Sequence, residues 1–256
     1  MPESFKIYPK TTTELNLDFD VSKSVIEKGD QDPWILKPTV KVFDDHEKAI
    51  IRGKVTDSTT TLGIPGVLVS IQNYSAGATE LKDSVIVHTS TLTSSEPGSE
   101  GDFSIFVEPG SPYNLVAYKD GYHPDFGTVQ ALGEMDVLED QNFILKSASV
   151  TGTLNGKILI SGLGPNEESP WATLSFRQQI ECGTSANPEM VELKSLNVEA
   201  GTTYSELLPV IPTPDPDQPC GNYQLVVSSH ERGTENKTPL IVNSGINHVE
   251  DISLLE

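Results

Sequence analysis

Histidines are the residues of this sequence whose chemistry is easiest to judge from spacing. His46, His88, His123, His230 and His248 are scattered, and none belongs to a His-Glu-x-x-His metal motif. The sequence also contains no Gly-x-Ser-x-Gly nucleophile elbow and no phosphate-binding glycine loop. Catalytic triads converge in space rather than in sequence, so spacing alone leaves one open. The motifs nevertheless favour a protein that is not an enzyme.

Carboxylates are the groups that could bind an inorganic ion, and calcium is the ion they would suit. The candidates come from two acidic runs, one at a predicted domain junction and one in a proline-rich segment: Asp44, Asp45, Asp215 and Asp217. Neither run has the spacing of a known calcium loop. Solvated surface charge is therefore the favoured interpretation and no cofactor is predicted, with a calcium site as the alternative.

Aromatic side chains next to acids are the residues that could bind a sugar, since such sites combine an exposed ring with polar hydrogen-bonding groups. One stretch of the chain offers both kinds of group: Tyr118, Asp120, Tyr122, Asp125 and Phe126. Trp171, beside Pro170, is a second candidate. The alternative interpretation is structural, with the ring of Tyr122 packed as a plug beneath the Gly121-Tyr122 turn.

Cys182 and Cys220 are the only cysteines, and both lie in the last third of the chain. A disulfide between them is expected and would stabilise the fold by about 4 kcal/mol. Two free thiols are the alternative, and a zinc site would need more ligands than these two residues offer. A disulfide would place the protein in an oxidising compartment.

The net charge excludes some classes of partner. The sequence has 37 acidic and 17 basic residues, a formal charge of -20, and no basic cluster. Such a surface repels nucleic acids and anionic lipid headgroups. No window approaches the roughly 20 apolar residues that span a bilayer, and no signal segment follows Met1. We expect an extracellular, periplasmic or cell-surface protein whose signal or lipoprotein anchor lies upstream of the given chain.

Short alternating apolar stretches, separated by Gly, Pro, Asn and Asp, predict the elements that position these residues. Val67, Val69 and Ile71 fall on one face of a predicted strand, and Ser70 and Gln72 fall on the other. This pattern recurs throughout a chain of 256 residues, which is long enough for more than one domain. The sequence therefore predicts an all-β protein of two tandem antiparallel sandwiches, resembling immunoglobulin or transthyretin domains.

The predicted sandwiches, residues 47–147 and 148–256, look like distant repeats. Gly53 in the opening strand of the first corresponds to Gly152 in the second, and Tyr113 corresponds to Tyr223. The second repeat is longer, largely because of a proline-rich run at 209–219, which is too dense in proline for a central strand. We expect this run to be a stiff surface loop.

Residues 1–46 form a separate segment with too few elements for a core. Residues 15–19 and 34–43 predict strands, and residues 21–27 predict a short helical turn. Such a segment must pack on the first sandwich or belong to a domain whose beginning is missing.

Several motifs of residues 48–147 resemble the carboxypeptidase regulatory-like domain, a transthyretin-like and carbohydrate-binding-like sandwich. They are Gly53-Lys-Val-Thr-Asp57, Gly63-Ile-Pro-Gly-Val-Leu-Val69, Gly101-Asp-Phe103, Pro109-Gly110, Tyr113 and Ala117-Tyr-Lys-Asp-Gly-Tyr122. The resemblance implies a sandwich used as a surface, stalk or accessory module without catalysis. Residues 1–46 resemble the end of a domain of unknown function called DUF4382, found in exported bacterial lipoproteins, through Leu17-Asp-Phe-Asp20, Lys23-Ser-Val25 and Trp34-Ile-Leu-Lys-Pro38.

A relative of this sandwich also forms an isopeptide bond between Lys and Asn, catalysed by a buried acid. Lys54 and Asn142 are the corresponding pair here, but no matching acid is found on an apolar strand between them. Lys54 lies on the same strand face as Arg52, so we expect its side chain to face solvent. Together these features predict a non-catalytic structural or adhesive module that interacts with other surface proteins, with a carbohydrate-binding module as the alternative.

Overall fold

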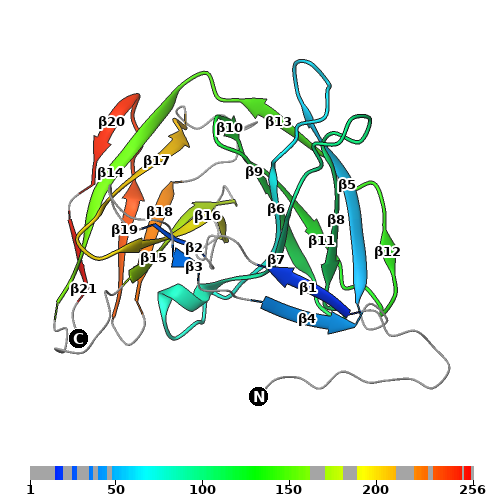
Figure 1. Ribbon diagram of the computed structural model, residues 1–256, viewed down its shortest axis with the longest axis horizontal. Coiled ribbons are helices and arrows are strands. Elements are labelled where there is room, and N and C mark those ends of the chain that lie inside the picture. The colour runs from blue at the N-terminus through cyan, green and yellow to red at the C-terminus, as the bar shows by residue number, and fades with distance from the viewer. Residues whose placement is uncertain are drawn as a thin grey trace.

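The chain is built almost entirely from β-strands (Figure 1). The computed structural model describes residues 48–161, 171–180, 189–211, 222–229, 233–249 and 251–254, together with the backbone of residues 15–19, 25–27, 35–36 and 40–44. These residues contain no α-helix and one 3-10 helix, η2 (Leu81–Ser84). The predicted all-β class is confirmed.

The first sandwich consists of two sheets that enclose one hydrophobic core. One sheet has the order β10-β13-β5-β12, with β8 also paired to β5: β5 (Ala49–Asp57), β8 (Asp102–Val107), β10 (Tyr122–His123), β12 (Val137–Leu138) and β13 (Phe143–Ser147). The facing sheet has the order β11-β9-β6-β7: β6 (Leu68–Tyr74), β7 (Val85–Leu92), β9 (Tyr113–Tyr118) and β11 (Asp125–Val129). Val69, Ile71 and Leu115 lie in this core, as their alternation predicts.

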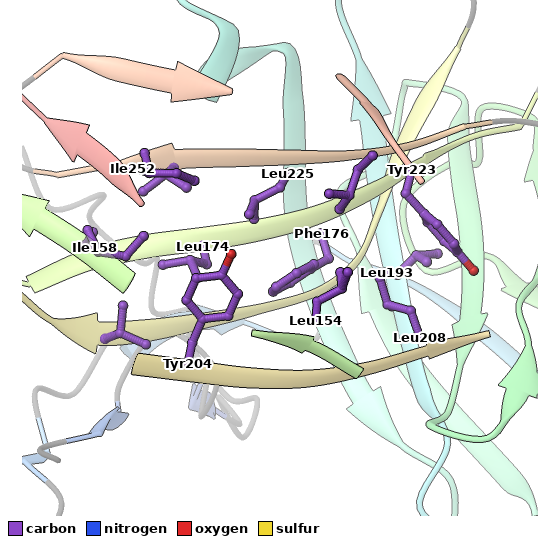
Figure 2. Packing of buried hydrophobic residues seen from close by; sticks show 14 of the residues in the cluster. Leu154, Ile158, Leu174, Phe176, Leu193, Tyr204, Leu208, Tyr223, Leu225 and Ile252 are labelled. Atoms are coloured by element: carbon purple, nitrogen blue, oxygen red, sulfur yellow. The ribbon is translucent and has the colours of Figure 1, made fainter. Parts of the chain in front are cut away.

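The second sandwich has its own core, in which Phe176, Tyr204 and Leu225 are fully buried (Figure 2). One sheet contains β14 (Thr151–Ile160), β17 (Thr203–Pro209), β20 (Gly245–His248) and β21 (Ile252–Leu254), with β14 paired to the other three. The facing sheet contains β15 (Trp171–Gln179), β16 (Met190–Glu199), β18 (Tyr223–Ser228) and β19 (Thr234–Leu240), in the order β19-β18-β15-β16.

The strands of the two sandwiches are connected in the same way. β5 pairs antiparallel with β8 and parallel with β12 and β13. In the second sandwich, β14 pairs antiparallel with β17 and parallel with β20 and β21. The order β11-β9-β6-β7 likewise corresponds to β19-β18-β15-β16. The topology therefore supports the internal repeat inferred from the sequence.

One pair of tyrosines shows the repeat at the level of a single hydrogen bond. Tyr113 begins β9 and donates its hydroxyl to the Glu108 carbonyl at 2.9 Å, just after β8. Tyr223 begins the corresponding strand β18 and donates to the Pro209 carbonyl at 2.9 Å, where β17 ends. Tyrosine corners of this kind tie a strand of a sandwich to backbone a few residues upstream.

We expect Tyr113→Phe and Tyr223→Phe each to lower the free energy of unfolding by about 1 to 2 kcal/mol, because each leaves a carbonyl without its donor. Urea unfolding followed by fluorescence measures the change. The control is Tyr122→Phe, because Tyr122 interacts with Asp57, an acid at the surface. If Tyr122→Phe lowered the free energy of unfolding as much as the other two substitutions, the structural role of the Tyr113 and Tyr223 hydrogen bonds would be contradicted.

The N-terminal segment confirms the strand predicted at 15–19 and has two strands where one was predicted over 34–43, but it differs from the prediction at 25–27. β1 (Leu15–Phe19) pairs with β4 (Val40–Asp44), and β2 (Val25–Glu27) pairs with β3 (Ile35–Leu36). The expected helical turn over 21–27 is therefore wrong at residues 25–27, which are β-strand because they find a partner strand. β2 also pairs parallel with β16, so this segment reaches the second sandwich rather than only the first.

Candidate functional site

The two sandwiches meet at a packed junction. Figure 1 shows them side by side along the long axis, with β16 between them. Alternation predicts that β9 buries only one face, yet all six of its residues are buried. The second face is covered because Val116 and Tyr118 join the hydrophobic core of the second sandwich. We call this contact the junction; its polar members are Gln72, Asn114, Asp120 and η2 from the first sandwich, with Arg177, Glu189, Glu192 and Lys194 from the second.

The Gln72 side chain hydrogen-bonds the backbone of β16 in the way that a neighbouring strand would. Its amide nitrogen donates to the Glu192 carbonyl at 2.6 Å, and its amide oxygen accepts from the Glu192 backbone N–H at 2.8 Å. Gln72 is 1% exposed, so both bonds are shielded from water. An unpaired strand edge attracts other chains. This side chain satisfies the edge of β16 and fixes its position on the first sandwich.

Arg177 fills a second part and carries the junction's buried positive charge. Ala172, Leu174 and Phe176 of β15 lie in the second core, so alternation places Arg177 on the opposite face, toward the first sandwich. Nη1 of Arg177 donates to the Leu81 carbonyl and to Ser84 Oγ, and Nη2 donates to the Lys82 carbonyl, each at 2.9 Å. The guanidinium therefore caps η2 of the other sandwich.

The charge of Arg177 is balanced within the second sandwich. Nε donates to Ser175 Oγ at 2.9 Å, and the Ser175 hydroxyl donates to Glu192 Oε2 at 2.5 Å. Burial lowers the pKa of Arg177, and the Glu192 carboxylate opposes that shift. Arginine keeps its proton in proteins even so. The result is a hydrogen-bonded chain from η2 to β16 in which every guanidinium nitrogen has a partner.

Tyr118 and Lys194 close the junction at another point. The Tyr118 hydroxyl has one proton to donate, and it lies 2.8 Å from Asp120 Oδ1 and 3.2 Å from the Leu207 carbonyl, so the carboxylate is the nearer acceptor. Lys194 Nζ donates to the same two acceptors at 2.9 and 3.0 Å, and it also pairs with Glu206. Burial, reinforced by Asp120, raises the pKa of Tyr118 well above its usual range, so the hydroxyl remains a donor. Asn114 adds a bond to Glu189 at 2.6 Å.

The predicted sugar-binding cluster is largely part of this junction. Tyr118 is 4% exposed and cannot offer its ring to a sugar, so that expectation is wrong for this residue; the physical reason is that the second sandwich covers it. Phe126 packs partly buried against the same core, and Asp120 binds Lys194. Asp125 accepts from the backbone N–H groups of its neighbour and of Ile144, which ties β11 to β13.

Two of the predicted aromatic residues lie apart from the junction contacts. Tyr122 is half-buried against the first core, close to the structural role that the sequence left open for it. Trp171 begins β15 in the second sandwich, and its carbonyl accepts from the Ser229 hydroxyl at 2.7 Å. Glycan binding therefore stays a prediction for Tyr122 and Trp171, which belong to different sandwiches.

The cysteines and most of the candidate calcium ligands lie outside the described residues. These are Cys182, Cys220, Asp45, Asp215 and Asp217, and Asp44 is described only by its backbone at the end of β4. The disulfide and the calcium site stay predictions. Within the described part of the chain, no group of three or more His, Cys, Asp or Glu residues could hold a metal ion. The described residues also include no helix long and apolar enough to cross a bilayer.

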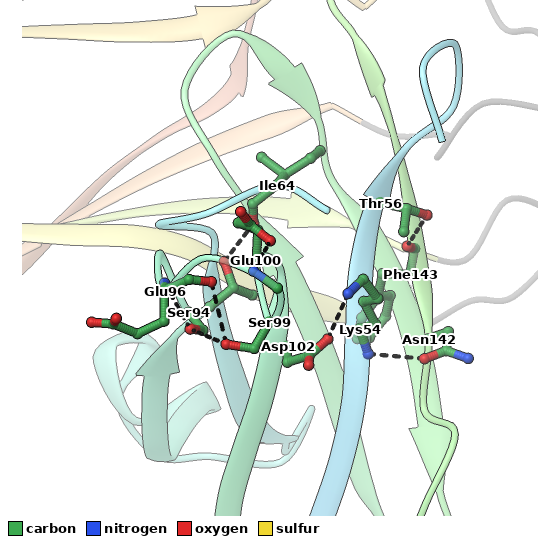
Figure 3. Close-up of polar contacts among 12 residues, drawn as sticks. Lys54, Thr56, Ile64, Ser94, Glu96, Ser99, Glu100, Asp102, Asn142 and Phe143 are labelled. Atoms are coloured by element: carbon green, nitrogen blue, oxygen red, sulfur yellow. Dashed lines mark hydrogen bonds and ion pairs between the residues drawn. The ribbon is translucent and has the colours of Figure 1, made fainter. Parts of the chain in front are cut away.

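Lys54 and Asn142, the pair that an isopeptide bond would need, are neighbours (Figure 3). Asn142 Oδ1 accepts from the Lys54 backbone N–H at 2.8 Å, while Lys54 Nζ donates to Asp102 Oδ1 at 2.8 Å. Asp102 begins β8, on the strand that pairs with β5 beside Lys54. The Lys54 and Asp102 side chains are 40% and 50% exposed, so their pairing is a surface ion pair rather than a buried reactive site.

Comparison with known proteins gives weak structural similarities only. No family model and no curated protein matches the sequence. One similar solved structure is the Bacillus anthracis TIE protein, with 13% identity and a TM-score of 0.31 over 87% of this chain and 40% of that chain. The shaft pilin SpaA from Lactobacillus rhamnosus GG has 10% identity and a TM-score of 0.27, over 82% of this chain and 97% of that chain. A streptococcal ancillary pilin has 11% identity and a TM-score of 0.29, over 91% of this chain and 74% of that chain. Values this low transfer neither a function nor an interface.

Proposed function

We propose that this chain is a non-catalytic structural module of an extracellular or cell-surface protein, and that its junction holds two sandwiches as one rigid unit for assembly with other surface proteins. The observation that carries the proposal is the buried capping of η2 by Arg177. Domains in one chain are expected to move relative to each other unless their interface is extensive and apolar. Here the interface combines a shared apolar core with buried, paired polar groups.

The junction favours rigidity because breaking it is costly at several points at once. Separating the sandwiches would break the bonds from Arg177 to the carbonyls of Leu81 and Lys82 and the two bonds between Gln72 and Glu192. A hydrogen bond exchanged for water costs about 0.5 to 1.5 kcal/mol, and about 1.5 to 3 kcal/mol where one partner is charged. It would also expose Val116 and Tyr118 to water. A unit that resists hinging suits a spacer or stalk better than a closing enzyme cleft.

The surface location and the family assignments rest on the sequence. The net charge of -20 suits an exported, soluble module. We propose that residues 48–147 form a carboxypeptidase regulatory-like domain because of their turn motifs, in which Gly101 and Gly110 have φ of 83° and 92°, values that favour glycine. The relation of residues 1–46 to DUF4382 rests on the quoted sequence motifs alone.

The rigidity has a direct test. Spin labels attached through non-natural amino acids at exposed Ser111 and exposed Thr203 place one probe in each sandwich and leave the cysteines untouched. We expect a single narrow distribution of label-to-label distances in pulsed electron paramagnetic resonance. Two labels within the first sandwich, at Ser111 and Thr60, give the reference width. A distribution between the sandwiches that is much broader than this reference would refute the proposal.

A further inference from the structure

The first strand of the first sandwich lies beside the last segment of the same sandwich, and both run in the same direction. β12 and β13 both pair parallel with β5, β12 near its start and β13 near its end. Further backbone bonds extend the contact: the Arg52 carbonyl accepts from the Gln141 N–H at 3.0 Å, and the Leu145 carbonyl accepts from the Ser58 N–H at 2.9 Å. Residues 136–145 therefore form a parallel ladder along almost the whole of β5.

Two residues close the break in this ladder between β12 and β13. Asn142 lies in the break, and its Oδ1 accepts from the Lys54 backbone N–H at 2.8 Å (Figure 3). Gly53 has no Cβ, which lets the Gln141 carbonyl oxygen approach to 2.0 Å from the place that a Cβ would take. The Asn142 side chain thus acts as a further rung between the two strand pairings.

The second sandwich has the same arrangement. β20 and β21 both pair parallel with β14, and between them the Val249 N–H donates to the Asn155 carbonyl at 2.7 Å. Just past the end of β14, the Ser161 N–H donates to the Leu254 carbonyl at 3.2 Å. In both sandwiches the first strand is also paired on its other side, β5 with β8 and β14 with β17. Neither first strand can therefore leave its sheet without breaking two ladders.

A short linker connects the two sandwiches in series. Only three residues, 148–150, separate β13 from β14. The Ala148 N–H donates to the Gly121 carbonyl of the first sandwich at 2.8 Å, and the Val150 carbonyl accepts from the Val210 N–H of the second sandwich at 3.0 Å. A pull along the chain therefore passes from the last strand of one sandwich directly to the first strand of the next.

Force applied between the two ends of either sandwich loads these parallel ladders in shear. The first strand is pulled toward its N-terminus and the last strand toward its C-terminus, so the two partners are driven past each other along their length. The evenly spaced hydrogen bonds of a parallel pair then share the load. A force on adjacent ends of the same two strands instead breaks the bonds one after another. Shear is therefore the more resistant of the two geometries.

We propose that this chain is a load-bearing element, in which each sandwich resists tension through the parallel ladder between its first and last strands. Tension arises where a surface protein is anchored at one end and holds a partner at the other. That use rests on the proposed surface function, whereas the resistance to force is a property of each sandwich by itself. It goes beyond the rigid unit, because Gln72 and Arg177 of the junction lie in the facing sheets, on β6 and β15.

Single-molecule pulling on the second sandwich of the full chain, in two directions, tests the proposal. Handles attached through a non-natural amino acid at exposed Ser149 and at the C-terminus load β14 and β21 in shear. Handles at exposed Ser161 and at the C-terminus peel the same two strands apart from their adjacent ends. We expect the unfolding force to be about threefold higher in the first geometry, because forced unfolding is set by the barrier and several rungs share the load. Equal forces, or a lower force in the first geometry, would overturn the proposal. The label distance between Ser111 and Thr203 reports the rigid unit separately, so failure of one proposal is distinguishable from failure of the other.

Removing one rung of the first ladder gives a second test. With handles at the N-terminus and at Ser149, we expect Asn142→Ala to lower the force that unfolds the first sandwich, because the Lys54 N–H loses its acceptor within the loaded ladder. Asn73→Ala is the matched control, since its amide donates to the Pro112 carbonyl at 2.8 Å but lies in the facing sheet. Each variant should lose about 1 kcal/mol in urea unfolding, the usual contribution of one hydrogen bond, yet only Asn142→Ala should lower the force. A force that Asn142→Ala leaves unchanged, or that both variants lower equally, would overturn the role of the ladder.

Discussion

Replacing Arg177 by methionine is expected to lower the free energy of unfolding by about 3 to 5 kcal/mol, the cost of removing one partner from a buried charged network. The guanidinium makes four hydrogen bonds, three of them to the η2 segment of the other sandwich. Methionine fills much of the volume but donates nothing. The Lys82 carbonyl then loses its guanidinium donor, the Leu81 carbonyl keeps only the Ser84 hydroxyl, and Glu192 loses the charge that balances it. Equilibrium unfolding in urea measures the loss.

Arg52→Met is the matched control, because Arg52 also lies in a strand but pairs with Glu139 at the surface, where its side chain is 49% exposed. Surface pairs contribute about 0 to 1 kcal/mol, so this variant should unfold almost like the parent. Arg177→Met should also broaden the distance distribution between Ser111 and Thr203, whereas Arg52→Met should not. Equal losses for the two variants would show that Arg177 does not hold the junction.

The sequence predicts the cores well but not the junction, and the reason is physical. Alternation identifies which strand face is apolar, and Val69 and Ile71 lie in the first core as predicted. The opposite face, with Ser70 and Gln72, is polar, yet these residues are 3% and 1% exposed. A polar strand face has the same pattern whether water or another sandwich covers it. Arg177 was missed in the same way, since its neighbours on that face are also polar.

For the aromatic cluster the predicted grouping of residues was right, but the expected exposure was wrong. Tyr118, Asp120 and Phe126 were grouped correctly, because β9 and β11 are adjacent strands. Their exposure was not predictable, since it depends on β16, which is far away in the sequence and was not known to cross this sheet. The internal repeat was the stronger signal, because β5 and β14 take corresponding places, but its predicted register was wrong: the strand pairings match Gly53 with Gly156 and Gly152 with Ala49.

Substituting Gly53 or Gly152 is the second change that we expect to lower stability strongly. A Cβ on Gly53 would lie 2.0 Å from the Gln141 carbonyl oxygen, and a Cβ on Gly152 would lie 2.1 Å from the Asn243 carbonyl oxygen. Both obstacles are backbone atoms, which cannot move aside as a flexible side chain can. We expect Gly53→Ala and Gly152→Ala each to lower the free energy of unfolding by about 3 kcal/mol, at the upper end of the usual cost of overpacking.

Gly77→Ala is the control for both variants, because no atom lies within 4 Å of its added Cβ and its φ is not positive. Alanine there reduces the freedom of the unfolded chain, so stability should stay equal or rise by up to about 1 kcal/mol. Urea unfolding compares the three variants. If Gly53→Ala and Gly152→Ala were as stable as Gly77→Ala, the close approach of the closing segment to the first strand would be wrong in both sandwiches.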